Sequence, residues 1–557
     1  MAADSLADEL AAEKKKHHAT EVAVDVMIMK KKKLLVVATA GGRPNAEPLF
    51  EIAKILHARG YVVEFATLES QECWANGYEF VSKFHILGPA IQLDVEEAGY
   101  LRMTDWKAPS LFGDARPIFD TKSFLEKSWP AVYSSLSAIM KDPESRPDFI
   151  LSDYIVDAVL DMQAEYGVPI AMNWPQMPTN MLPASYIPGT AGLQIGVLTS
   201  EHATLWQRMK SELVGLAMVP ELLRYLRNRR KMRASMGVTR SLPNGPKPDN
   251  LLLVNLFFGL EVAKDTPPNV VAVGPVLADD YPHLTEPALS FVQNHKKIIY
   301  VAFGTHVLFR DDTVRRVMAG LAEVLHRGVA DGIIWAIRGM ARKQLDLAAD
   351  APGRFNGKCT VGELLNGYNP NMLFVDFAPQ RAVLDHSHTC LFISHCGAAS
   401  VNEATFHGVP LVTLSVYFDQ LQNAMRLRDA GVSLGLDKDT FTADDLSNAV
   451  TQVIDDPTGS FQRNSKRMQA ISRIASKRKH LAADLIEEVH ADHEWRHVDS
   501  ISTRPPHLQT ADVRMPFWKA RNWDLYACFA LLAGMSAVAI PAAFLYNLVR
   551  RREKKDG

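Results

Sequence analysis

The sequence predicts an α/β fold with two domains, each built on a parallel sheet, followed by one C-terminal transmembrane helix. Short apolar runs alternate with amphipathic helical segments, a pattern typical of parallel sheets that are covered on both faces. This alternation occurs in two series, which a stretch rich in Pro and turn residues separates. The third observation is an uncharged apolar run near the C-terminus, from Leu525 to Val549.

The composition excludes several classes of protein. The 557 residues are 47% apolar and 22% charged, which excludes collagen-like, disordered and coiled-coil chains. The formal net charge of −2 provides no general attraction for nucleic acid, so nucleic acid is not an expected partner.

The first series predicts an N-terminal domain over residues 32–245. Residues 1–31 are largely polar, and we expect them to form a disordered N-terminal segment. The order strand, helix, strand then occurs twice, at residues 34–40, 49–60, 61–67, 147–153, 154–167 and 168–174.

Residues 206–233 mix Leu, Met and Trp with many Arg. Two interpretations stay open for this segment: it lies on a membrane surface, or it is a helical flap covered by basic residues.

The second series predicts a C-terminal domain over residues 296–500, which a Pro-rich linker at 246–295 joins to the first. Its strands are expected at residues 297–305, 332–339, 371–377, 390–397 and 408–416. Neither series begins with the glycine-rich loop of a dinucleotide-binding redox enzyme or of a P-loop NTPase, which argues against both classes.

A membrane span is predicted over residues 524–549, between a juxtamembrane segment at 501–523 and a basic tail at 550–557. As a helix the uncharged run is roughly 37 Å long, which is enough to cross a hydrocarbon core of about 30 Å. A buried core helix is the alternative, but such helices rarely reach this length without a polar face.

The sequence leaves open which side of the membrane the body occupies. The basic tail predicts a cytosolic C-terminus, and its last residues, Lys-Lys-Asp-Gly, resemble the dilysine retrieval signal of the endoplasmic reticulum. That topology places the body in the lumen and requires a signal peptide, which the N-terminus does not show. A chain without a signal would instead be tail-anchored with a cytosolic body. We therefore predict a single-pass protein of the endoplasmic-reticulum membrane.

The most specific pattern runs from Phe377 to Gln420: FAPQRAVLDHSHTCLFISHCGAASVNEATFHGVPLVTLSVYFDQ. A buried strand over residues 391–394 leads through His395 into a helix over residues 398–406. Ligands of open α/β sheets bind at the carboxyl ends of strands, and a helix N-terminus there suits a phosphate. This segment therefore predicts a phosphate-binding site.

Further polar residues in this stretch suit a nucleotide sugar. Ser400 adds a hydroxyl, and one turn later Glu403 can accept hydrogen bonds from a vicinal diol such as ribose. The next strand is expected to end at Asp419 and Gln420, whose side chains suit sugar hydroxyls. The alternative is that Ser400 and Glu403 form a capping box, which needs no ligand.

The stretch as a whole resembles the donor-binding signature of the UDP-glycosyltransferases, which are inverting family-1 enzymes with the GT-B fold. The spacing from Phe377 through Ala-Pro-Gln, His, Gly, Ser and Glu to Asp-Gln matches without a gap. The resemblance implies two Rossmann-like domains that face each other across a cleft, the first binding the acceptor and the second the UDP-sugar. The C-terminal span is similar to that of membrane-anchored, fungal-like members.

The resemblance also implies a role for each matching residue. Phe377 would stack on uracil, Gln380 would lie at the edge of the base, and Glu403 would bind the ribose. Asp419 and Gln420 would bind the sugar, and Gln at the last position suggests glucose.

The same resemblance implies a diphosphate site. Thr305, which follows the first strand of the second domain, would hold the diphosphate together with His395, Gly397 and Ser400. One residue of this loop departs from the family pattern, because Cys396 stands where Gly is usual.

Activation of the acceptor is the point where the chain departs most from the family. In the family a His in the first N-domain loop activates the acceptor hydroxyl, and an Asp after a later strand orients it. Asp153 matches that Asp, but Asn45 stands at the position of the His, and an amide cannot accept a proton near pH 7.

Three interpretations stay open. The acceptor is acidic enough, or Asp153 or another group serves as the base. The enzyme is slow, or the loop is aligned one step off and Glu47 is the base. In the third interpretation the protein binds UDP-sugar or lipid without transferring anything.

Two functions follow. The first is inverting transfer of a hexosyl group, expected to be glucose, from a UDP-sugar to a hydroxyl of a lipophilic small molecule. The alternative is a catalytically weak or inactive membrane protein that binds UDP-sugar or lipid. The UDP-sugar is a co-substrate, and neither a cofactor nor a metal is expected, since His490, His493 and His497 near Glu487 and Glu494 lack the spacing of a metal motif.

Overall fold

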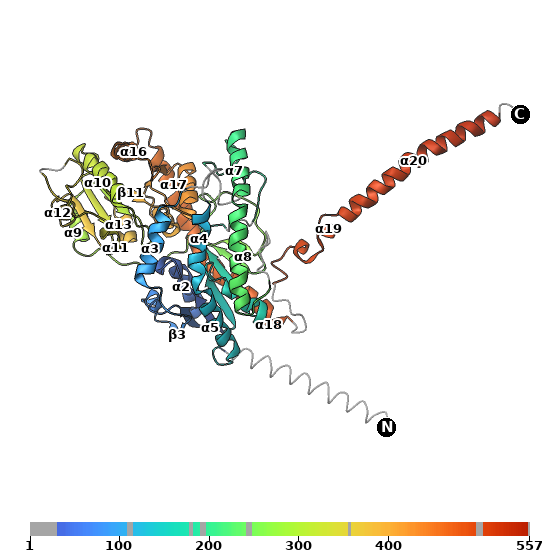
Figure 1. Cartoon of the computed structure of the whole chain (residues 1–557), viewed down its shortest axis with the longest axis horizontal. Helices are drawn as coiled ribbons and strands as arrows, with labels where there is room; N and C mark the ends of the chain where they lie inside the picture. Colours follow the sequence, from blue (N-terminus) through green and yellow to red (C-terminus); the bar gives the residue numbers. More distant parts are fainter. Residues whose placement is uncertain are drawn as a thin grey trace, which may run out of the picture.

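Two α/β domains and a long projecting C-terminal helix make up the computed structural model (Figure 1). It describes residues 31–107, 115–177, 182–189, 196–240, 248–354, 358–496 and 505–554. Apart from Lys31, the segment predicted to be disordered lies outside these residues.

The first domain contains a seven-stranded parallel sheet with the order β3-β2-β1-β4-β5-β6-β7. Leu34 and Val36 of β1 pack into one core cluster, whereas Leu35 and Val37 pack into another, so both faces of the sheet are covered. This is the alternation that the apolar runs predict. The strands are β1 (Lys33–Val37), β2 (Val62–Thr67), β3 (Val81–Ile86), β4 (Phe149–Asp153), β5 (Ile170–Trp174), β6 (Leu251–Val254) and β7 (Val270–Ala272).

The first domain is longer than the sequence analysis indicates. β6 and β7 lie in the range predicted as the linker 246–295. They nevertheless belong to the first sheet, because β6 pairs with β5 and β7 pairs with β6. Leu251 and Leu253 are fully buried in the first-domain core. The surrounding Pro and turn residues hide these short strands in the sequence. The helices of this domain are α2 (Arg43–Ala58), α3 (Leu93–Thr104), α4 (Arg116–Leu125), α5 (Trp129–Lys141) and α6 (Ala158–Tyr166).

The second domain contains a six-stranded parallel sheet with the order β10-β9-β8-β11-β12-β13. Its strands are β8 (Ile298–Ala302), β9 (Gly332–Ala336), β10 (Met372–Val375), β11 (Thr389–Ser394), β12 (Leu411–Thr413) and β13 (Ser433–Gly435). Five of these coincide with predicted strands. Its helices are α9 (Ala288–Asn294), α10 (Asp311–His326), α11 (Gly339–Arg342), α12 (Val361–Leu365), α13 (Gln380–Asp385), α14 (Ala398–His407), α15 (Asp419–Asp429), α16 (Ala443–Asp455) and α17 (Ser460–Ala475).

Helix α18 (Lys479–Trp495) returns to the first domain, although it lies within the range predicted for the second. Its apolar residues belong to the core cluster of β1 and α2. The Lys479 ammonium lies 3.0 Å from the Glu51 carboxylate, and Tyr61 Oη lies 2.8 Å from His490 Nδ1. His490 is thus a buried packing residue, and His497 lies outside the described residues.

The Arg-rich segment at 206–233 forms two helices, α7 (Leu205–Ala217) and α8 (Val219–Ser235). A new helix begins here because Pro220, near the start of α8, has no N–H to continue the hydrogen bonding of α7. Large apolar side chains of both helices are exposed, namely Leu205, Trp206, Met209, Leu213, Leu216, Val219, Leu222 and Leu223.

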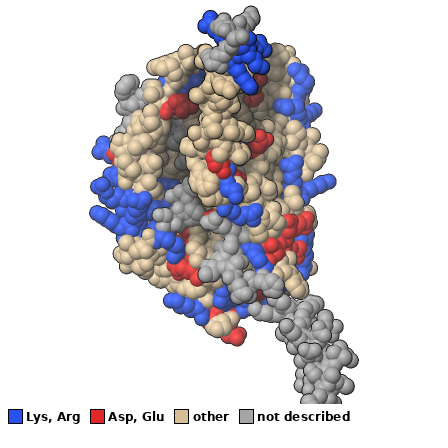
Figure 2. Space-filling model, turned by 90° about the vertical axis from the view of Figure 1, so that its right-hand side faces the viewer, with Lys and Arg blue, Asp and Glu red and all other residues tan. Residues whose placement is uncertain are grey.

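Helix α20 (Trp523–Glu553) follows the short helix α19 (Phe517–Ala520) and projects from the body (Figure 1). Within the described residues, α20 is the one helix long and apolar enough to cross a membrane, and its apolar window has no buried residues. Lys and Arg side chains lie on both flanks of the molecule when it is viewed from the side of this helix (Figure 2). Residues 555–557 of the predicted tail lie outside the described residues.

Candidate active site

The carboxyl ends of the two sheets meet at the domain interface. The loop between β1 and α2 lies against the loop between β8 and α10. The contact is at Gly42, where an added Cβ would be 3.5 Å from Cε1 of His306. The charge of Glu47 on α2 raises the pKa of Glu403 on α14. Residues predicted separately from the two halves of the sequence therefore face one site.

The predicted phosphate loop joins β11 to α14. His395 lies between two glycines: a Cβ on Gly304 would be 2.7 Å from its Nε2, and a Cβ on Gly397 would be 2.5 Å from the same atom. A side chain at either position would collide with the imidazole. Burial lowers the pKa of His395 to about 4, although a hydrogen bond to the Ala302 backbone raises it, so the ring is neutral at pH 7 and has a single N–H donor.

The structure does not contain the predicted alternative of a capping box. Gly397 is the N-cap of α14 and has no side chain to cap the helix, and Ser400 lies inside the first turn. Gln380 Nε2 instead donates to Ser400 Oγ at 3.2 Å and to Glu403 Oε2 at 2.5 Å. The polar groups of this stretch therefore form a cluster beside the helix rather than a cap.

Glu403 is held in an unusual electrostatic state. Burial raises its pKa to about 7, although the hydrogen bond from Gln380 and the charge of Arg381 act in the opposite direction. A buried carboxylate has lost its hydrogen bonds to water, so a ligand that supplies hydroxyl donors stabilises its charged form. A ribose diol would supply two.

Asp419 and Gln420 differ from prediction in their local structure. β12 ends at Thr413, so both residues begin α15 instead of ending a strand. Burial raises the pKa of Asp419 to about 6, and its carboxylate accepts hydrogen bonds from Asn423 and from the Ala398 N–H. Asn423 Nδ2 lies 3.1 Å from Asp419 Oδ2.

Gln420 is 4% exposed and partly engaged with its own loop. Its Oε1 accepts hydrogen bonds from the N–H groups of Val416 at 3.0 Å and Tyr417 at 3.2 Å. Sequence alone could not show this, because the turn that brings these groups together is not regular secondary structure.

Phe377 and Thr305 are the two remaining predicted residues of the donor site. Phe377 follows β10 and is 73% exposed, which is exceptional for a large aromatic side chain and leaves its ring free to stack. Thr305 is half-buried, and its Oγ1 lies 3.2 Å from His306 Nδ1.

Asn45 and Asp153 are in direct contact. Asn45 lies in the first turn of α2, and Asp153 is the last residue of β4. Asp153 is 1% exposed; its Oδ1 accepts a hydrogen bond from the Ile155 N–H at 3.0 Å, and its carboxyl is also hydrogen-bonded to Asn45. Burial raises its pKa to about 7.

Glu47, the alternative base, has different surroundings. Burial and the charge of Glu51 raise the pKa of Glu47, whereas the charges of Arg43 and Arg381 lower it. Asn45, rather than Glu47, is hydrogen-bonded to Asp153.

Sequence analysis missed His306, which directly follows Thr305. Its Cε1 lies near Gly42, and its ring centroid is 4.8 Å from that of Tyr100 on α3. The only signal in the sequence is its place beside a matched residue.

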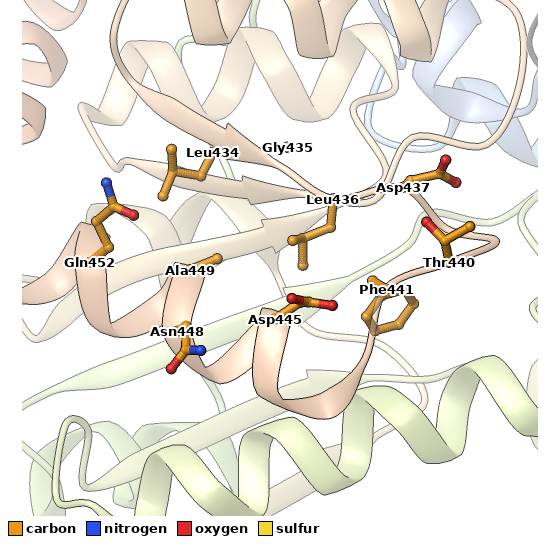
Figure 3. Close-up of a pocket in the computed structure, with 10 residues that line it drawn as sticks. All are labelled: Leu434, Gly435, Leu436, Asp437, Thr440, Phe441, Asp445, Asn448, Ala449 and Gln452. Carbon is orange, nitrogen blue, oxygen red and sulfur yellow. The ribbon is translucent and has the colours of Figure 1, made fainter.

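A pocket of about 390 Å³ lies away from this site, between β13 and α16 (Figure 3). No predicted site residue lines it, and its Asp445 caps α16 together with Thr442. We therefore assign it no part in the chemistry.

Comparisons with known proteins agree with this geometry. Residues 140–480 match the family described as UDP-glucoronosyl and UDP-glucosyl transferase. A UDP-glycosyltransferase of Talaromyces amestolkiae is 43% identical over 90% of this chain and 95% of its own length, and UDP-glycosyltransferase stmC of Aspergillus ustus is 40% identical over 90% and 95%.

Solved structures share the fold. The glycotransferase of kitacinnamycin has a TM-score of 0.57 at 20% identity, covering 82% of this chain and 99% of its own. A UDP-glucose: anthocyanidin 3-O-glucosyltransferase in complex with UDP has a TM-score of 0.53 at 17% identity, covering 82% and 99%.

Fold and site together define a two-domain glycosyltransferase of the GT-B class that binds a UDP-sugar. The chain belongs to the UDP-glucuronosyl and UDP-glucosyl transferase family, and it transfers a sugar from a UDP-sugar. Nothing among the relatives supports the alternative of an inactive binding protein.

Proposed function

We propose that this transferase moves glucose, with inversion, from UDP-glucose to a hydroxyl of a lipophilic small molecule. One observation carries the proposal: the cluster of Gln380, Ser400 and Glu403 beside the α14 N-terminus faces α2 of the other domain, where the charge of Glu47, two residues after Asn45, acts on Glu403. The cluster suits the nucleotide, and the opposite face is where an acceptor would approach.

The donor side supplies the leaving-group chemistry. As the bond between the sugar and the diphosphate breaks, negative charge grows on the phosphate, and preorganised donors stabilise it. We assign this role to the neutral His395, the N-terminal turn of α14 and the Thr305 hydroxyl. Gln420 supports glucose as the sugar by its match to the family signature only.

We further propose that the reaction needs neither a metal nor another cofactor, with the UDP-sugar acting as co-substrate. The protein donors just described take the electrostatic role that a divalent cation plays in other transferases. Incubation with EDTA followed by assay in metal-free buffer should leave the rate of UDP release unchanged, and a loss restored by added Mg²⁺ or Mn²⁺ would contradict this.

The test of the transfer reaction measures UDP release by the purified full-length protein. UDP-glucose, UDP-galactose and UDP-glucuronate are each supplied with a panel of sterol, polyketide and phenol acceptors. We expect turnover with UDP-glucose, and a loss of turnover in Asp153→Asn. Wild-type protein that binds UDP-glucose but never turns over, beside an active Asn45→His variant, would favour the inactive alternative.

We also propose that α20 anchors the enzyme in the endoplasmic-reticulum membrane. Its exposed apolar surface supports this, and the exposed Leu and Trp side chains of α7 and α8 offer a second apolar surface to lipid. A chain ending at Asn522 should leave the membrane fraction. A glycosylation tag at each end of the chain would show which end reaches the lumen.

A further inference from the structure

The reaction needs a group that takes the acceptor proton, and neither residue of the Asn45–Asp153 pair is suited to do so. Asn45 has no basic lone pair. The Asp153 carboxyl is 1% exposed and already receives hydrogen bonds from the Ile155 N–H and the Asn45 side chain. A base that contacts the acceptor must therefore come from elsewhere in the site.

His306 lies at the required place. It belongs to the second domain, yet its imidazole reaches the first-domain loop that precedes α2 and Asn45: a Cβ on Gly42 would be 3.5 Å from its Cε1 and 3.7 Å from its Nε2. The preceding residue in the chain, Thr305, is a predicted diphosphate ligand. The ring thus lies between Thr305, the predicted diphosphate ligand, and the first-domain loop that precedes Asn45.

The surroundings fix the ring and its loop. Tyr417 Oη donates a hydrogen bond to the His306 carbonyl at 3.1 Å, and the ring of Tyr100 lies on one side at a centroid distance of 4.8 Å. Thr305 Oγ1 lies 3.2 Å from Nδ1 and 3.4 Å from Nε2. In the tautomer that carries its proton on Nδ1, the lone pair of Nε2 is the basic group of the ring.

We propose that His306 is the general base of this transferase, replacing the base that Asn45 cannot supply. The inference rests on the transfer reaction proposed above. As the acceptor O–H bond breaks, its proton goes to His306 Nε2 and the oxygen forms a bond to the anomeric carbon. The bond between that carbon and the diphosphate breaks, and its electron pair leaves with UDP. His306 then releases the proton to water.

The charges around the ring suit this cycle. In the free protein, burial and the Arg338 cation lower the pKa of His306 to about 4, so its lone pair is available at pH 7. The other titratable groups facing the ring are His395, Tyr100 with its partner Glu96, and Tyr417. A bound diphosphate beside Thr305 adds negative charge, which raises the pKa and strengthens the base only when the donor is present.

The test compares wild type with His306→Gln, which retains hydrogen bonding but cannot accept a proton. We expect kcat to fall about 100-fold, with the Kd for UDP-glucose changed by less than about threefold. Among the acceptors that wild type uses, the loss should be largest for an aliphatic alcohol and smaller for an acidic phenol. The acidic limb of the pH profile of kcat should disappear in the variant.

Two further variants separate a chemical role from a structural one. Asn45→His in the His306→Gln background should restore part of the lost kcat, because it returns a base to the facing loop. The control is His326→Gln, an exposed residue at the far end of α10, which should behave as wild type.

The outcomes that overturn the inference are distinct. Wild-type kcat in His306→Gln would overturn it and leave the proposed function intact. A parallel loss of UDP-glucose affinity and kcat, equal for all acceptors, would make His306 a phosphate ligand instead. Absence of turnover in wild-type protein that still binds UDP-glucose would overturn the proposed function, and the inference with it.

Discussion

Glu403 shows how burial can link ligand binding to pH. Its pKa of about 7 lies above the ordinary value of 4.5, so the carboxyl becomes protonated as the pH falls through 7. We propose that Glu403 binds the ribose diol, and a protonated carboxyl would lose acceptor capacity for it. We expect the affinity for UDP-glucose to weaken by up to about tenfold between pH 8 and pH 6, as measured by calorimetry.

The matched control for this pH dependence is Glu403→Gln, which should bind more weakly at pH 8 and show little change with pH. Asp153 also has a pKa of about 7, and Asp153→Asn should retain the pH dependence because its carboxyl lies on the acceptor side. UDP-glucose is the suitable probe because its diphosphate has no proton to lose in this range. An unchanged slope in Glu403→Gln would contradict the assignment.

Phe377 gives a second prediction at the scale of one side chain. Stacking of a base on an aromatic ring contributes about 1–3 kcal/mol, so Phe377→Ala should weaken UDP binding by roughly 5- to 150-fold. The side chain is 73% exposed, so the melting temperature should not change. Phe377→Trp should bind at least as tightly as wild type, and equal affinity in all three proteins would remove Phe377 from the site.

At the scale of elements, the turn between β11 and α14 holds a conformation that favours glycine. Cys396 has a φ of 67°, and its side chain is fully buried. Both Cys396→Gly and Cys396→Ala remove the thiol, but only the alanine keeps a Cβ in the left-handed region. The glycine variant should be more stable than the alanine variant by about 1 kcal/mol, or about 2 °C in melting temperature.

The same element explains the match to the family signature. β11, its exit loop and α14 are contiguous in the chain, so their spacing alone places His395, Gly397, Ser400 and Glu403 along one strand–loop–helix unit. Asp419 and Gln420 were predicted as the end of a strand, but the chain leaves β12 at Thr413 and α15 begins at Asp419. Local pattern does not determine where a short strand ends when its neighbours are also apolar.

At the scale of the whole molecule, a buried ion pair connects the two domains. Arg426 of α15 lies 2.8 Å from the Glu261 carboxylate of the first domain, with both side chains at most 6% exposed. Arg426→Met would leave the buried Glu261 carboxylate with the Val262 N–H at 3.0 Å and the more distant Lys264 ammonium at 4.0 Å. We expect a loss of about 3 kcal/mol, visible as a lower melting temperature.

Two comparisons check that this loss comes from an uncompensated charge. The double variant with Glu261→Met should recover much of the stability, because neither charge is then left alone. Arg428→Met, which removes an exposed pair with Asp429, should change the stability by less than about 0.5 kcal/mol. A double variant as unstable as Arg426→Met would show that packing, rather than charge, is responsible.

Local sequence patterns suffice to predict the two parallel-sheet domains, the donor motif and the C-terminal apolar helix. Each of these is a property of contiguous residues, since strand alternation, helix periodicity and motif spacing are all local. Asp153 could be selected as well, because it matches the family and ends a predicted strand.

The domain boundaries and the surroundings of the site residues follow only from long-range packing. β6, β7 and α18 belong to the first domain because their apolar residues complete its core, which no local pattern records. His306 faces Gly42, and Asp153 and Glu403 have raised pKa values, because folding buries these groups and brings together residues far apart in the chain. Burial and proximity arise from long-range packing, and the chemistry of this site depends on both.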